Sequence, residues 1–392
     1  MTETGALLRR LRVERGYSLV RFAREANYSK GYISKLENGD KPVSPEMARR
    51  FDRILETQGV LTRAVAGPVP APPVLPDGPD PWALVLGGTD PLAPNSTHVD
   101  EQTVEVYAAA FETWRMMGHR MSPAFVLPNL VGHCRALREL IAVNPLPDLI
   151  RQASRYAEYA GWMYQEAGDN TRAREWTATA VRLADRVGDV GLRSWAMVRT
   201  AEIALYTEDG ATMVEWARRA AAAPESTAAL RSAAAQRMAQ GYALLGEASA
   251  CLSALDEAHR WQEAATAESG PHYGSTSLPD QIAITRGWSL HHLDRSAESV
   301  LLLGSELDRI PPTSIRSRVR FGVRLALAEL DCGDVEGACA RMEALVADLR
   351  RTDSATVRVD VNTMRRLLLK HTGNPAASVL RPELNELVRT AI

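Results

Sequence analysis

The sequence predicts an all-α protein in which a small helical domain is joined by a proline-rich linker to a larger array of paired helices. Three observations predict this architecture. Short apolar segments with serine caps and glycine stops occupy residues 1–66, nine prolines fall between Pro68 and Pro94, and alanine-rich helical patterns with recurring turns occupy residues 99–392. We call residues 1–66 the head, residues 67–98 the linker and residues 99–392 the body.

The composition is that of a folded protein with an uneven distribution of charge. Of the 392 residues, 45% are apolar and 24% are charged, which excludes a wholly disordered chain. The head carries 13 Lys and Arg against 8 Asp and Glu, whereas the rest of the chain carries 33 against 40. A basic head on an acidic body indicates that only the head meets a polyanion.

The head contains several short helices, each marked by a cap or a stop. Serine accepts a hydrogen bond from a free N–H at the start of a helix, proline is tolerated in the first turn, and glycine suits the left-handed residue after the end. The predicted helices are residues 6–14, stopped by Gly16; residues 19–26, capped by Ser18; residues 30–38, between Ser29 and Gly39; and a helix opened by Ser44 and Pro45.

The second and third of these helices carry a helix-turn-helix pattern. Ala23 is small where the two helices cross, and Asn27 stands at the corner, where asparagine tolerates a left-handed backbone. The apolar residues that fix the third helix across the second are Phe22, Ala26, Tyr28, Ile33 and Leu36. This combination predicts that one side of residues 30–38 is buried and the other is free.

These residues resemble those of a known family. Leu11-Arg12-x-x-Arg15-Gly16-Tyr17-Ser18, Phe22-Ala23 and Ser29-x-x-x-Ile33-Ser34-x-Leu36-Glu37-Asn38-Gly39 are similar to the XRE family of phage-repressor-type regulators. The resemblance covers most of the head and implies a compact five-helix domain whose third helix enters the major groove of DNA. It also implies that Arg12 pairs with Glu37 near a phosphate.

The resemblance and the residue types together give the candidate contacts with double-stranded DNA. The base-reading positions of the family fall on Lys30, Gly31, Ser34 and Lys35, and a lysine can donate to O6 and N7 of guanine. Ser18 and the N–H groups behind it form a phosphate site. The full set is Arg12, Ser18, Ser29, Lys30, Gly31, Ser34, Lys35, Asn38 and Lys41. The alternative for each lysine taken singly is a solvated surface charge.

The body shows a weak internal repeat of helix pairs. The turns fall at Gly168, Gly210, Gly246, Asp294 and Gly333. Small residues precede and follow most of these turns at fixed offsets, as Gly161 and Ala173 do around Gly168. Such pairs bury their apolar faces by stacking. The pattern resembles tetratricopeptide repeats with elongated helices, and a generic helical array is the alternative. Residues 99–145 are the expected entry pair and residues 356–390 the closing pair.

A stack of this kind has a concave groove lined by the first helix of each pair. Carrying over the groove-facing positions of the resembled repeat gives a polar and aromatic set, which suits a peptide backbone and its side chains. The set is Arg155, Glu158, Trp162, Gln165, Gln236, Gln240, Gln281, Trp288, His291 and Arg320. The alternative is that Trp162 and Trp288 are buried between repeats because the assignment is off by one position.

The sequence shows no motif for catalysis, a cofactor or a metal. It has no Gly-x-Gly-x-x-Gly, no phosphate loop, no His-Glu-x-x-His and no serine in a nucleophile elbow. His291 and His292 are adjacent, so they face different sides of a helix. The four cysteines are widely spread without a Cys-x-x-Cys pair, which favours small buried thiols over zinc or redox chemistry. We therefore expect no enzyme activity, no cofactor and no metal.

The layout of the chain predicts its class of function. No signal peptide opens the chain and no apolar run approaches the roughly 20 residues that span a bilayer, so we expect a cytoplasmic protein without membrane contact. The layout resembles quorum-sensing receptors that join this helix-turn-helix to tetratricopeptide repeats and bind short peptides. This implies a homodimeric transcription regulator whose body senses a peptide or a small molecule. A ligand would shift the spacing of two heads on half-sites about 34 Å apart.

Two alternatives to this function remain. In the first, the chain binds DNA constitutively and its body docks a protein partner. In the second, the chain is a helical-repeat enzyme or accessory factor that only resembles a regulator. The second alternative predicts no salt-dependent binding to duplex DNA.

Overall fold

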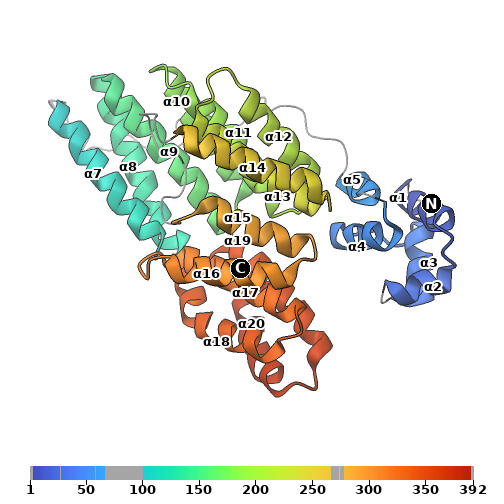
Figure 1. Cartoon of the computed structure of the whole chain (residues 1–392). Coiled ribbons are helices and arrows are strands. Elements are labelled where there is room, and N and C mark those ends of the chain that lie inside the picture. The colour runs from blue at the N-terminus through green and yellow to red at the C-terminus, as the bar shows by residue number, and fades with distance from the viewer. Residues whose placement is uncertain are drawn as a thin grey trace.

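The computed structural model describes residues 3–26, 28–57, 59–66, 100–265, 273 and 278–389. Every regular element in those residues is a helix, which confirms the all-α prediction (Figure 1). Asn27 at the predicted corner and the whole proline-rich linker lie outside the described residues.

The described part of the head is a bundle of five helices. They are α1 (Glu3–Glu14), α2 (Leu19–Glu25), α3 (Lys30–Asn38), α4 (Pro45–Leu55) and α5 (Val60–Ala66). The predicted caps are confirmed, because Oγ of Ser18, Ser29 and Ser44 each accepts a hydrogen bond from the backbone N–H three residues further on. Gly39 ends α3 with φ at 80°, a left-handed conformation that favours glycine. The first helix begins three residues earlier than the sequence predicted.

The core of the head fixes α3 against its neighbours. Phe22, Ile33, Leu36 and Phe51 are completely buried, and the rings of Phe22 and Phe51 lie 5.1 Å apart between centroids. Burying a side chain of this size contributes about 1.5–3 kcal/mol to folding. The apolar contact predicted between residues 30–38 and the preceding helix is therefore present, and it leaves the opposite side of α3 to solvent.

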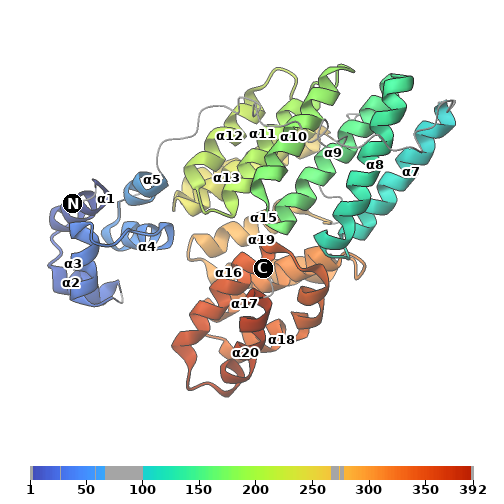
Figure 2. The same ribbon diagram turned by 180° about the vertical axis from the view of Figure 1, so that it is seen from behind.

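The described body is built from helices that pack in consecutive pairs, which Figures 1 and 2 show side by side with α7 furthest from the head. The helices are α7 (Glu101–Gly118), α8 (Pro123–Val143), α9 (Pro147–Ala167), α10 (Asn170–Asp185), α11 (Gly191–Leu205), α12 (Gly210–Ala222), α13 (Ala228–Leu244), α14 (Ala248–Ala265), α15 (Gln281–His292), α16 (Ser296–Arg309), α17 (Ile315–Asp331), α18 (Val335–Thr352), α19 (Ala355–Leu367), the 3-10 turn η1 (Leu368–His371) and α20 (Pro375–Arg389). The predicted entry pair corresponds to α7 and α8, which both pack more extensively on α9 than on each other, and the predicted closing pair corresponds to α19 and α20.

Four of the five predicted turns fall in the loop between the two helices of a pair. Gly168, Gly246, Gly333 and Asp294 all have positive φ there. The fifth prediction was wrong in detail. The left-handed residue of that turn is Glu208, with φ at 55°, and Gly210 is instead the first residue of α12.

Gly210 is needed for packing rather than for the turn. A Cβ atom on Gly210 would lie 2.6 Å from the carbonyl oxygen of Gly241 in α13, and a Cβ on Gly241 would lie 2.8 Å from the oxygen of Gly210. Real Cβ atoms do not approach backbone oxygens this closely. The two glycines therefore let α12 and α13 cross at short range.

The body curls until its last helices meet its first ones. Arg316 of α17 donates from Nε to the oxygen of Gly118 at the end of α7, and from Nη1 to Glu166 Oε2 in α9, at 2.7 Å each. Ser354 and Thr356, at the start of α19, also donate to the Glu166 carboxylate. The groove expected from the sequence is thereby closed on one side into a cavity.

Candidate DNA-binding surface and body cavity

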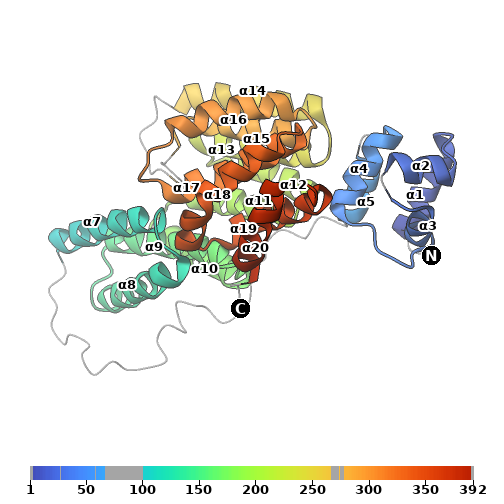
Figure 3. The same cartoon turned by 90° about the horizontal axis from the view of Figure 1, so that it is seen from below.

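The outer side of α3 is exposed and points away from the body. Lys30, Gly31 and Lys35 are exposed and Ser34 is half-buried. Figures 1 and 3 show α4 and α5 between α3 and the body, so the body does not cover these residues. A helix with one buried apolar side and one free polar side has the geometry required to enter the major groove.

The other predicted contacts flank α3 or lie beneath it. Ser18 and Ser29 are exposed caps of α2 and α3, and Asn38 is exposed at the end of α3. Lys41 is exposed in the following loop, with Nζ 5.0 Å from the centroid of the Tyr32 ring. Lysine over an aromatic ring keeps its charge available while its stem is held in place.

Arg12 differs from the other candidates because it is only 8% exposed. Its Nε donates to Glu37 Oε1 at 2.5 Å, its Nη2 donates to Glu37 Oε2 at 2.9 Å, and its Nη1 donates to the oxygen of Tyr17 at 2.7 Å. The hydrogen bond with Glu37 raises the pKa of Arg12. The pairing implied by the family resemblance is present. The side chain holds α1 to α3 from within the head and does not reach the outer side of α3.

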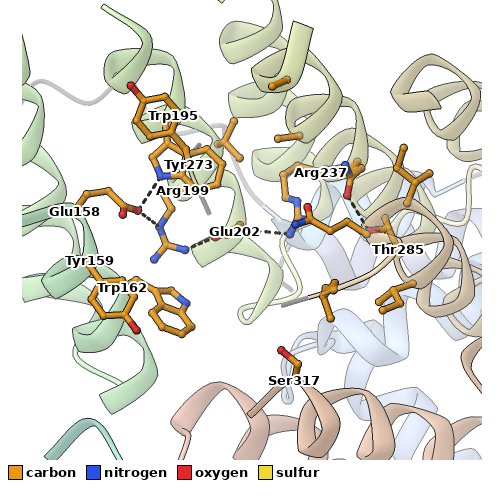
Figure 4. A pocket seen from close by; sticks show the side chains of 18 of the residues that line it. Glu158, Tyr159, Trp162, Trp195, Arg199, Glu202, Arg237, Tyr273, Thr285 and Ser317 are labelled. Carbon is orange, nitrogen blue, oxygen red and sulfur yellow. Dashed lines mark hydrogen bonds and ion pairs between the residues drawn. The ribbon is translucent and has the colours of Figure 1, made fainter. Parts of the chain in front are cut away.

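A cavity of about 1390 Å³ lies inside the curve of the body. Its wall comes mainly from the first helix of successive pairs, namely α9, α11, α13, α15 and α17, with the end of α7 at one side. Figure 4 shows a polar wall running from Glu158 past Arg199 to Arg237, with aromatic side chains at one end. Pockets for drug-sized ligands are typically 300–1,000 Å³, so this cavity has room for a larger molecule.

Eight of the ten predicted groove residues line this cavity. They are Arg155, Glu158, Trp162, Gln165, Gln236, Gln240, Gln281 and Arg320. Trp288 and His291 do not line it. Trp288 lies on the same side of α15 as Gln281 but two turns further on, where Arg324 covers it with Cζ 4.7 Å from its ring centroid. His291 stacks on Trp288 at 4.5 Å, on the side towards the head.

The two tryptophans therefore have different environments. Trp162 is partly exposed at the cavity wall, whereas Trp288 is 4% exposed and packs into the core of the last repeats. The groove-facing assignment of α15 had the correct helical face. The prediction that Trp288 lines the cavity was wrong, because Arg324 closes the cavity before it reaches this part of α15.

The sequence missed the residues that α11 contributes. Arg199 and Glu202 form the middle of an alternating row of charges, in which Arg199 Nε lies 3.6 Å from Glu158 Oε1 and Arg237 Nη1 lies 3.2 Å from Glu202 Oε1. Arg199 also contacts Glu202 directly. Trp195 of the same helix donates from Nε1 to Glu158 Oε1 at 2.7 Å. The repeat around Gly210 is the weakest in the sequence, so no groove position could be carried over onto α11.

Burial sets the charge state of several groups around the cavity. Desolvation raises the pKa of Glu158, although Arg199 beside it acts in the opposite direction. Desolvation lowers the pKa of His119 to about 4, so this imidazole is neutral at pH 7. Burial also raises the pKa of Glu166, but Arg320 and Arg316 outweigh it and bring the value down to about 2. The cavity is thus lined by fixed charges, most of which are already paired.

Three of the four cysteines are buried as predicted, and the prediction was wrong for Cys332, which is exposed at the turn after α17. Within the part of the chain that the structure describes, no three His, Cys, Asp or Glu side chains are placed to hold a metal ion. Across the same residues, no helix combines the length and the apolar character that crossing a membrane requires.

Comparison with known proteins identifies the head alone. Residues 3–65 match a family of helix-turn-helix domains. No curated protein and no solved structure matches the chain. The matched residues span α1 to α5, so the exposed α3 is the second helix of a helix-turn-helix unit. This supports a DNA-binding regulator.

Proposed function

We propose that this chain is a sequence-specific transcription regulator whose body binds a ligand that controls the DNA affinity of the head. The observation that carries the proposal is the combination of a free, polar outer side on α3 with a large polar and aromatic cavity in the same chain. The helix pairs and their close glycine crossings support a tetratricopeptide-like body. No catalytic role is assigned to any residue.

The cavity is better suited to a short peptide than to a small molecule. Its volume exceeds that of a typical small-molecule pocket. Amide side chains line it, and Gln240 is 5% exposed with an Oε1 that accepts no hydrogen bond from the described residues. An unsatisfied buried acceptor is costly, and rotation of this amide towards the cavity would let its oxygen accept a hydrogen bond from a peptide N–H. Trp162 offers apolar area for a side chain of the ligand.

A second candidate function is supported by the entry pair. Val106 and Met116 on α7, and Phe125 and Val143 on α8, are large apolar side chains that are between 45% and 66% exposed. A contiguous apolar surface of exposed side chains is typical of contact with another protein, and this candidate takes these four to belong to one such surface. In this candidate the head binds DNA constitutively and the body docks a protein partner through α7 and α8.

Genome-wide mapping of bound sites, together with purified duplexes, tests the regulator. The log of the affinity should fall linearly with the log of the salt concentration, by about 0.9 for each phosphate neutralised. A homodimer predicts a symmetric motif with half-sites about 34 Å apart. Binding to duplex DNA without sequence preference contradicts the proposal, and so does binding that does not depend on salt.

The ligand site is tested with a pool of short synthetic peptides in equilibrium dialysis. Ala233 lines the cavity, and Ala233→Trp should reduce binding by filling it. Ala340 lies exposed on α18, so Ala340→Trp is the matched control and should bind the pool as the unmodified chain does. If both variants bind the peptides equally well, the peptides bind outside the cavity, and the docking candidate is favoured.

A further inference from the structure

The head docks on the body through ion pairs between α4 or α5 and the turns of the body. Arg49 of α4 pairs with Glu208 at 2.5 Å, and Arg63 of α5 pairs with Glu247 at 2.6 Å. Arg53 of α4 pairs directly with Asp294. The three arginines belong to the basic head and the three carboxylates to the acidic body, so the charge asymmetry of the sequence is matched by contacts.

The three carboxylates lie in corresponding turns of successive repeats. Glu208 follows α11, Glu247 follows α13 and Asp294 follows α15, each in the turn after the first helix of a pair. The C-terminal end of a helix carries partial negative charge, which adds to that of the carboxylates. We call these three residues the carboxylate row. It forms an electronegative edge, and the described head lies against that edge with α3 facing away.

The same three helices line the cavity. The middle of α11 contributes Arg199, that of α13 contributes Gln236 and Gln240, and α15 contributes Gln281 and Thr285. Each helix therefore has one part in the cavity wall and its end in contact with the head. Any occupant that changes the spacing of α11, α13 and α15 also changes the spacing of the three carboxylates.

Close backbone packing accompanies the ion pairs. Gly59, at the start of α5, has φ at 79°, and a Cβ atom there would lie 2.6 Å from the carbonyl oxygen of Leu245. A partly exposed ion pair is weak by itself, so the contact depends on all three pairs being aligned at once. Small polar interfaces between domains are readily opened.

We propose that the carboxylate row is a docking surface for α4 and α5 of the head, and that the contents of the cavity determine whether all three ion pairs form together. The coupling rests on the proposed function, because it takes the cavity as the ligand site. The docking itself does not rest on it. The docked head is then one state of a switch, and the released head, tethered through residues 67–99, is the other.

Small-angle scattering of the full chain tests the docking surface. Glu208→Arg should release the head and increase the radius of gyration, and the exchange Arg49→Glu with Glu208→Arg should restore the value of the unmodified chain. Asp308→Arg reverses an exposed charge on α16 that makes no ion pair with the head, and it is expected to change nothing. An unchanged radius in Glu208→Arg at low salt overturns the docking surface.

A second variant tests the same surface without changing charge. Gly59→Ala should release the head because the new Cβ meets the oxygen of Leu245. Gly16→Ala imposes similar backbone strain at φ of 69°, but nothing lies within 4 Å of the added atom, so the head should stay docked. Circular dichroism confirms that both variants are folded. Equal radii for the two variants contradict close packing at Gly59.

Salt titration tests the coupling, with Ala233→Trp as a covalent occupant of the cavity. The head should be released at a lower salt concentration in this variant than in the unmodified chain, whereas Ala340→Trp should leave the release point unchanged. Identical release points in all three proteins overturn the coupling. The scattering and salt-titration experiments use neither DNA nor peptide. A failure of the docking proposal can therefore be distinguished from a failure of the regulator proposal.

Discussion

Arg12 and Glu37 are joined by two hydrogen bonds that connect α1 to the end of α3 inside the head. Removing one partner of a buried pair leaves the other charge without compensation, whereas replacing both by apolar side chains of similar size is often nearly neutral. The pair therefore sets how firmly α3 is held.

Arg12→Met is expected to lower the free energy of unfolding of the head by about 3–5 kcal/mol, because Glu37 is left buried and unpaired. Urea denaturation followed by circular dichroism measures the change. The double variant Arg12→Met with Glu37→Met should recover much of the loss. A single variant as stable as the unmodified chain would show that the pair is not needed.

Lys35→Ala is expected to weaken binding to the preferred DNA site by about 1–3 kcal/mol and to relax the preference at one base pair. Lys41→Ala is the control, since a phosphate contact should weaken binding to all sequences alike. Fluorescence anisotropy with specific and random duplexes distinguishes the two. If Lys35→Ala loses the same affinity on both duplexes, the lysine contacts the backbone and not a base.

Gly241→Ala is expected to destabilise the body by about 1–3 kcal/mol, because the added methyl group meets Val214 at 2.7 Å and the oxygen of Gly210 at 2.8 Å. Gly304 lies inside α16 with nothing within 4 Å of a built Cβ. Gly304→Ala should therefore stabilise by about 0.5–1 kcal/mol through its better helix propensity. Thermal unfolding tests both variants, since Gly241→Ala should lower the melting temperature and Gly304→Ala should raise it. Shifts of the same sign would contradict the close crossing of α12 and α13.

Glu166 should make the body sensitive to acid in a defined range. Its pKa is lowered from 4.5 to about 2 in the folded chain, so its contribution is present above pH 4.5 and is lost as the pH falls towards 2. The difference in unfolding free energy between the unmodified chain and Glu166→Gln should shrink over that range. His119, whose pKa is lowered to about 4 in the folded chain, costs both proteins stability as the pH falls from 6.5 towards 4. Because Glu166 itself raises the pKa of this imidazole, the comparison is made in a His119→Gln background, which isolates the contribution of Glu166. A difference that stays constant down to pH 2 would contradict the assignment.

Local signals in the sequence predicted the elements well. The serine caps and glycine stops of the head depend on one backbone N–H or one left-handed residue, so they can be identified within a few positions. The turns at Gly168, Gly246 and Gly333 could be predicted for the same reason, because each needs one left-handed residue. The turn predicted at Gly210 was misplaced because a close crossing of two helices and a tight turn both favour glycine.

Long-range packing could not be predicted from these signals. Glu166 and Arg316 are 150 residues apart, and nothing near either residue indicates that they meet. The end of the cavity at Arg324 depends on how α17 lies against α15, which repeat periodicity does not determine. The charged row on α11 was missed for a different reason, because the repeat that would have located it is too weak.

The contact of Glu166 with Arg316 has a consequence for how the body can be divided. Ordinary helical-repeat proteins are modular, because each unit touches only its neighbours and units can be removed from an end. Here α17 and α19 complete the packing around the end of α9, and α17 supplies part of the cavity wall. A chain truncated before Ile315 would lose both arginines that pair with Glu166, the helices that bury this carboxylate and part of the cavity wall, so the cavity depends on the whole body and cannot be assigned to one repeat.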